Sequence, residues 1–206
     1  MMTPGRANFR IYQGSTFNQI FRWESKTLEY AIIEDIAKSA PCIITVAAGQ
    51  PLPPPSWRIR VTGSGGSGSV GMKEINLIDQ PEKYYVSTDI VGRTVSINEI
   101  NSVNYGTYIS GGVLSWYQPV PLTGLSAEMQ IRKNISSTEI IAELSSADGD
   151  IEFDDIDKTI KLTIPKTVTV DFDFTTAVYS FEITNSLGST FTFLQGNLTL
   201  VKEVTR

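Results

Sequence analysis

The stretch "GGVLSWYQPVPLTGLSAEMQIR" (residues 111–132) changes character halfway along and decides how the chain is divided. Its second half, residues 126–132, alternates strictly between apolar and polar side chains, which predicts a strand with one buried face. Its first half contains Trp116 and Tyr117, and the residues just before them do not read as a partner strand. The stretch "TFNQIFRWE" (residues 16–24) has the pattern of a partner strand, so we expect these two distant segments to pair.

Strand patterns continue on both sides of this stretch. From residue 120 onward, alternating segments arrive about every 8 to 12 residues with turn residues between them, which is typical of a β-sandwich. Residues 7–24 predict a first hairpin with its turn at Gly14 and Ser15. The Gly- and Ser-rich residues 63–71 are expected to form an exposed loop, because the helix that a phosphate-binding loop needs does not follow them.

Two segments leave alternatives open. Residues 29–40 carry apolar side chains near helical spacing but also suit a strand, and we favour the strand because Pro41 ends any helix there. Residues 166–174 alternate like a strand, although the preceding Pro165 could open a short helix instead.

The economical arrangement makes the chain all-β. Residues 1–27 and 114–206 would form one immunoglobulin-like β-sandwich, interrupted by residues 28–113 as an inserted small β-barrel-like domain. Such insertions are tolerated at exposed loop tips, because the cost of closing a loop grows slowly with its length. The return strand around Trp116 would then pair with residues 21–24, where the chain leaves the sandwich.

Composition excludes several classes of function. The chain has 206 residues with 17 basic and 22 acidic side chains, and a formal charge of -5 argues against nucleic acid as a partner. No apolar run approaches the roughly 20 residues that span a bilayer, and the N-terminal residues lack the apolar core of a signal peptide. We therefore expect a protein that is made in the cytoplasm and has no membrane partner.

Few residues could carry chemistry. The chain has no histidine, which excludes Ser-His-Asp and Cys-His nucleophiles, and its one cysteine, Cys42, lies in the apolar run "PCIITV" and is expected to be buried. The acidic segment "DGDIEFDDIDK" (residues 148–158) places an apolar strand between its ends, so a hairpin with Asp-rich turns is favoured over a calcium site. We predict no enzyme activity, no catalytic residue, no metal and no cofactor.

Aromatic side chains are the candidates for a contact surface. Neighbouring residues in a strand point to opposite faces, so one of each aromatic pair is expected to be available to a partner. The candidate interface residues are Trp57, Tyr84, Tyr85, Tyr105, Tyr108 and Trp116.

Several ordered motifs outside residues 28–113 carry a resemblance. They are "G-x-T-F" (14–17), "P-x-x-L-T-G" (119–124), "M-Q-I-R" (129–132), "V-Y-x-x-E-I" (178–183) and a terminal "E-V-T-R" (203–206). Together they resemble a family of phage tail and baseplate proteins, and they are similar to the N-terminal domain of the upper baseplate proteins of phages of Gram-positive bacteria.

The inserted residues 28–113 resemble another phage-tail module, distantly similar in fold to the first catalytic-cysteine half-domain of ubiquitin-activating enzymes. Where such modules have a His-Gly pair after their first strand, this chain has Gly49 and Gln50. The resemblance implies a non-enzymatic structural protein of a virion, in the tail, baseplate or neck, that joins other virion proteins and its own copies in a symmetric multimer. The alternative is a receptor- or glycan-binding module of a phage tail.

Overall fold

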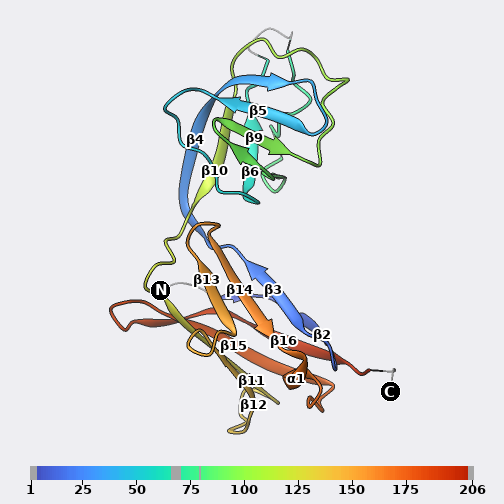
Figure 1. Ribbon diagram of the computed structural model, residues 1–206, viewed down its shortest axis with the longest axis vertical. Coiled ribbons are helices and arrows are strands. Elements are labelled where there is room, and N and C mark those ends of the chain that lie inside the picture. The colour runs from blue at the N-terminus through green and yellow to red at the C-terminus, as the bar shows by residue number, and fades with distance from the viewer. Residues whose placement is uncertain (1–3, 66–70, 79, 204–206) are drawn as a thin grey trace. The chain divides into compact units, whose positions relative to one another are not determined.

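The computed structural model describes residues 4–65, 71–78 and 80–203 (Figure 1). The chain is all-β, as predicted, and its described residues contain one short helix, α1 (Lys166–Thr169). Residues 66–70 of the Gly-rich segment and most of the terminal "E-V-T-R" motif lie outside the described residues.

The chain divides into two compact units, and each is described by itself. Unit 1 comprises Met1–Phe21 and Pro121–Arg206, and unit 2 comprises Arg22–Val120. Unit 2 extends beyond the predicted residues 28–113 at both ends, because the strands that enter and leave it are longer than expected.

The strands of unit 1 form two sheets. In chain order they are β1 (Gly5–Arg6), β2 (Phe9–Tyr12), β3 (Phe17–Phe21), β11 (Ser126–Arg132), β12 (Ile140–Ser145), β13 (Ile151–Asp154), β14 (Thr159–Ile164), β15 (Thr176–Thr184) and β16 (Thr190–Val201). One sheet has the order β1-β16-β15-β11-β12, with β2 also paired to β16, and the other has the order β13-β14-β3. The predicted alternation of β11 is confirmed, since Ala127, Met129 and Ile131 are buried.

The predicted first hairpin is wrong. The strand β2 pairs in parallel with β16, whereas β3 pairs antiparallel with β14, so the two neighbours belong to different sheets. The Phe9 ring centroid lies 5.6 Å from that of Phe17 and 6.0 Å from that of Phe21. Their apolar faces therefore meet across the core between the two sheets, where burial of aromatic rings stabilises the sandwich more than one short hairpin would.

The two ambiguous segments resolve differently. Residues 24–37 form the long strand β4, as favoured, whereas the strand prediction for residues 166–174 is wrong, because Pro165 precedes the short helix α1. Phe172 and Phe174 beyond the helix are nevertheless both buried, with ring centroids 5.2 Å apart. The alternating apolar residues Phe172 and Phe174 are therefore buried although they do not belong to a strand.

Unit 2 is built on one curled sheet. Its strands are β4 (Glu24–Ala37), β5 (Cys42–Val46), β6 (Arg58–Thr62), β7 (Tyr85–Val86), β8 (Ile90–Val91), β9 (Thr94–Ile97) and β10 (Val113–Pro119). Their order is β7-β6-β10-β4-β5-β9-β8, and the sheet bends into a half-barrel (Figure 1). The predicted turn near Gly92 joins β8 to β9. Cys42 is fully buried, as expected, and burial raises the pKa of its thiol.

The segment that re-enters unit 1 pairs differently from the prediction. Trp116 lies opposite Glu29 and Tyr117 opposite Leu28, and the return strand does not reach Glu24 until Pro119. The predicted pairing of Trp116 and Tyr117 with residues 21–24 is therefore wrong. The register is set by the burial of the Trp116 ring within unit 2. The main-chain N–H of Val120 then donates to the oxygen of Trp23 over 2.9 Å, at the end of unit 2.

Candidate functional site

Trp57 and Trp116, two of the candidate interface residues, are both buried. Each indole is buried in the core of unit 2, where large flat rings fill the space enclosed by the curled sheet. The Nε1–H of Trp57 donates to the main-chain oxygen of Tyr117 over 2.7 Å. These two indoles therefore stabilise the unit from inside.

Three of the tyrosine candidates are partly buried against the same core. The hydroxyl of Tyr85 donates to the oxygen of Ile75 over 3.0 Å, and burial raises the pKa of Tyr85 to about 12. The hydroxyl of Tyr108 donates to the oxygen of Ile33 over 3.0 Å, and burial raises its pKa too. Tyr105 also packs on this core. These three tyrosines therefore stabilise the core of unit 2.

Tyr84 is the exception, with 47% of its surface exposed. Tyr84 and Tyr85 differ in burial, but Tyr84 precedes the strand β7, which begins at Tyr85. The guanidinium of Arg58 lies over the Tyr84 ring, 5.1 Å from its centroid. Arg58 also donates to both carboxylate oxygens of Glu24, over 2.7 and 2.5 Å, and this bonding raises the pKa of Arg58.

A hollow of about 470 Å³ opens beside Tyr84 on the outer face of the unit 2 sheet. Its wall includes Arg60, whose guanidinium donates to the oxygens of Leu77 and Pro81 over 2.8 Å each. The residues that line it are Glu24, Leu28, Arg58, Arg60, Thr62, Pro81, Glu82, Lys83, Tyr84, Ser115, Trp116 and Tyr117. The hollow combines apolar surface with charged groups, and Arg58 and Arg60 are both already bonded within the unit.

An exposed apolar row continues from this hollow along β4. Leu28, Tyr30 and Ile32 point outward, and Tyr117 lies opposite Leu28 on β10; we call these four residues the outer stripe. Tyr30 and Ile32 are 56% and 57% exposed. The outer stripe was not predicted from the sequence. The pattern that could have indicated it is that β4 carries apolar residues on both of its faces. A strand that is apolar on both faces is expected to be covered on both.

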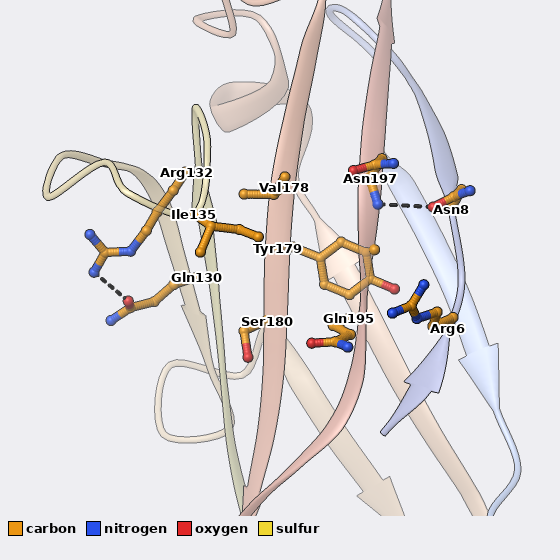
Figure 2. A pocket seen from close by; sticks show the side chains of 11 residues that line it. Arg6, Asn8, Gln130, Arg132, Ile135, Val178, Tyr179, Ser180, Gln195 and Asn197 are labelled. Atoms are coloured by element: carbon orange, nitrogen blue, oxygen red, sulfur yellow. Dashed lines mark hydrogen bonds between the residues drawn. The ribbon is translucent and has the colours of Figure 1, made fainter. Parts of the chain in front are cut away.

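A second hollow, the sheet groove, lies in unit 1 and has a volume of about 610 Å³. Figure 2 shows the side chains that line it over the six-stranded sheet, between β11 and the Arg6–Asn8 segment. The lining residues are Arg6, Asn8, Gln130, Arg132, Ile135, Val178, Tyr179, Ser180, Gln195, Gly196 and Asn197. Val178 and Ser180 alternate with the buried Tyr179 and Phe181 along β15, but the sequence does not show which strands lie side by side.

One wall of the sheet groove is formed by a chain of hydrogen bonds. The guanidinium of Arg132 donates to Oε1 of Gln130 over 2.7 Å and to the main-chain oxygen of Ser137 over 2.9 Å (Figure 2). The amide nitrogen of Gln130 in turn donates to Glu143 over 2.8 Å. Arg132 is thus held in place by neutral acceptors.

The opposite wall is held by main-chain contacts of Ala7. Its N–H donates to the oxygen of Gln195 over 3.2 Å, and its oxygen accepts the Tyr179 hydroxyl over 2.9 Å. Burial raises the pKa of this phenol. A Cβ at Gly196 would lie 1.8 Å from the Ala7 oxygen, so only glycine permits this close approach. Together these contacts fix the Arg6–Asn8 segment beside β16.

The acidic segment forms the predicted hairpin, β13 to β14, and its carboxylates cap turns. Asp155 accepts the N–H of Leu122 over 3.1 Å, the hydroxyl of Thr123 over 2.6 Å and Nζ of Lys158 over 2.8 Å. These bonds, led by the Lys158 contact, lower the pKa of Asp155 to about 2. In the part of the chain that the structure describes, no group of three His, Cys, Asp or Glu side chains is placed to hold a metal ion.

Comparison with models of known protein families finds no match, and comparison with curated proteins finds none either. Among the described residues, no helix has the length and apolar character needed to cross a bilayer.

Proposed function

We propose that the chain is a non-enzymatic structural component of a phage virion, in the tail, baseplate or neck, acting as an assembly or fibre-adaptor protein in a symmetric multimer. The motif resemblance to phage tail and baseplate proteins supports the proposal. The structural observation that carries it is the outer stripe of unit 2. The partners are other virion proteins and further copies of the chain.

The outer stripe has the properties of a contact surface. It lies in the middle of a sheet face, because β4 is paired on one side with β10 and on the other with β5. Large apolar side chains placed next to one another on a solvent face favour burial against a partner, at about 25 cal/mol for each Å² removed from water. Tyrosine and isoleucine at its centre, Tyr30 and Ile32, supply rigid apolar area.

The alternative, a receptor- or glycan-binding module that stacks sugars on the aromatics of unit 2, has less support. Trp57 and Trp116 are buried, and Tyr85 and Tyr108 use their hydroxyls within the unit. Tyr84 is left as the exposed ring among the six candidates, and it is already stacked with Arg58.

The test is incorporation into particles. The double variant Tyr30→Lys, Ile32→Lys places two charges in the outer stripe, and the matched control is Leu187→Lys, an isolated apolar residue of unit 1 that is 89% exposed. A phage whose own copy of the gene is deleted is complemented with each variant, and purified particles are analysed by mass spectrometry and electron microscopy. Light scattering of the purified chain measures its multimeric state.

We expect the control to enter particles normally and the double variant to be lost from them by about tenfold or more, because each buried charge without a partner disfavours the contact strongly. Absence of the wild-type chain from purified particles would contradict the virion proposal. Normal incorporation of the double variant would show instead that the outer stripe is not the contact.

A further inference from the structure

The sheet groove of unit 1 plays no part in the assembly function proposed above, and its lining points to a ligand. We propose that the sheet groove binds an acidic oligosaccharide. Two arginines and four residues with side-chain amides line one hollow, and none of the described residues that line it carries a carboxylate. This is an uncommon surface on a chain whose formal charge is -5.

The two guanidinium groups supply the charge that an anionic sugar needs. Arg132 donates to the neutral acceptors Gln130 and Ser137, and the carboxylate of Glu143 bonds to the Gln130 amide. Arg6, on the opposite side of the groove, is exposed and forms no ion pair with any described residue. Guanidinium groups that keep free donors form strong, charge-assisted hydrogen bonds to carboxylate or phosphate groups.

The remaining polar groups suit sugar hydroxyls. Gln195, Asn197 and Ser180 stand beside one another on β15 and β16, where Ser180 lies opposite Gln195 in the register (Figure 2). Each amide offers donors and an acceptor within one side chain, which matches the paired hydroxyls of a sugar ring. Val178 and Ile135, the latter 90% exposed, add apolar surface for the C–H face of such a ring.

A peptide ligand fits this surface less well. The groove lies over β11, β15 and β16, whose main-chain N–H and C=O groups are used in ladders with one another and with the N-terminal strands. A peptide therefore has no open strand edge on which to add, which is how extended segments commonly gain affinity. A saccharide needs only the side-chain groups that the groove presents.

The groove is also built in advance of binding. The Ala7 contacts hold Arg6 and Asn8 beside β16, and the Asn8 Oδ1 atom accepts the N–H of Asn197 over 2.9 Å. This bond leaves the Asn8 amide nitrogen as a donor toward the groove. Groups that are fixed before the ligand arrives lose less conformational entropy on binding.

The test is calorimetric titration of the full chain with three acidic probes: oligogalacturonate, sialyllactose and a phosphorylated oligomannose. Their neutral counterparts and an oligoglutamate peptide are titrated in parallel. We expect at least one acidic saccharide to bind with a dissociation constant of about 1 mM or tighter, and its neutral counterpart about tenfold more weakly. Failure of all three acidic saccharides to bind, or equally tight binding of oligoglutamate, would overturn the proposal.

Variants locate the site. Arg132→Gln and Arg6→Gln should each weaken binding of the acidic saccharide by about tenfold, while Asn197→Ala should weaken acidic and neutral saccharides alike. The matched control is Lys161→Gln, which removes one positive charge from the other sheet of unit 1. Circular dichroism checks that each variant is folded. Unchanged affinity in both folded arginine variants would overturn the assignment, and this result is independent of the outer stripe in unit 2.

Discussion

The hydroxyl of Tyr179 donates a hydrogen bond to the main-chain oxygen of Ala7 over 2.9 Å, which ties β15 to the segment between β1 and β2. The two residues are separated by almost the whole of the chain. The bond therefore joins the N-terminal segment to the centre of the six-stranded sheet and holds one wall of the sheet groove in place.

The variant Tyr179→Phe removes this bond and leaves the Ala7 oxygen without its side-chain donor. We expect the free energy of unfolding to fall by about 1 kcal/mol, measured by urea denaturation. The matched control is Tyr12→Phe, whose side chain is exposed on β2 and should change stability by less than about 0.5 kcal/mol. Equal stability of the two variants would contradict a structural role for the Tyr179 hydroxyl.

Glycine at position 196 is required by the same contact. In Gly196→Ala the new Cβ would lie 1.8 Å from the Ala7 oxygen, a main-chain atom that moves only if the N-terminal segment shifts. We expect a loss of about 2 kcal/mol in unfolding free energy and faster amide hydrogen exchange at Ala7. Thr199→Ala, at an exposed position on the same strand, is the control. Unchanged exchange at Ala7 in Gly196→Ala would refute the close approach.

The Asp155 carboxylate should make unit 1 sensitive to acid. Its pKa is lowered to about 2, so its contribution to stability is present above the ordinary aspartate pKa of about 3.9 and is lost as the pH falls toward 2. We expect Asp155→Asn to melt at a lower temperature than the wild type at neutral pH, and the difference to close between about pH 4 and pH 2. Asp171→Asn, which changes an exposed carboxylate, is the control; a difference that persists unchanged below about pH 2 would exclude this mechanism.

Tyr85 should make unit 2 sensitive to alkali. Burial favours the neutral phenol, so its stabilising effect is complete below the ordinary tyrosine pKa of about 10 and is lost as the pH rises through about 12. We expect Tyr85→Phe to lose less stability than the wild type between about pH 10 and pH 12. Thermal melts measure the stability, and phenolate absorbance measures the ionisation of the tyrosines. If every tyrosine of the folded protein ionised near the ordinary pKa, the prediction would be wrong.

Trp57→Phe tests the core of unit 2. The change removes the donor to the Tyr117 oxygen and leaves space where the indole was, so we expect a loss of about 2 kcal/mol in unfolding free energy. The control Tyr84→Phe keeps the exposed ring beside Arg58 and should cost less than about 0.5 kcal/mol. A Trp57 variant as stable as the control would mean that the indole contact contributes little.

Part of the fold and little of the candidate site could be predicted from local pattern. Alternation of apolar residues correctly indicated which side of β11 is buried, since successive strand residues always point to opposite faces. The outer stripe was open to the same reasoning, because Leu28, Tyr30 and Ile32 alternate with Ala31 and Ile33. The sheet groove was not, since its walls come from segments that are distant in the sequence.

The sequence by itself determined that the chain is all-β, that Cys42 is buried and that the Asp-rich segment is a hairpin, because each depends on a few neighbouring residues. Only the tertiary structure decided that β2 and β3 belong to different sheets and that Tyr117 pairs with Leu28. A strand with one apolar and one polar face can pair with any other strand whose apolar side chains point to the same side of the sheet. The choice among partners is made by long-range packing of rings such as Phe9 against Phe21, which local periodicity does not encode.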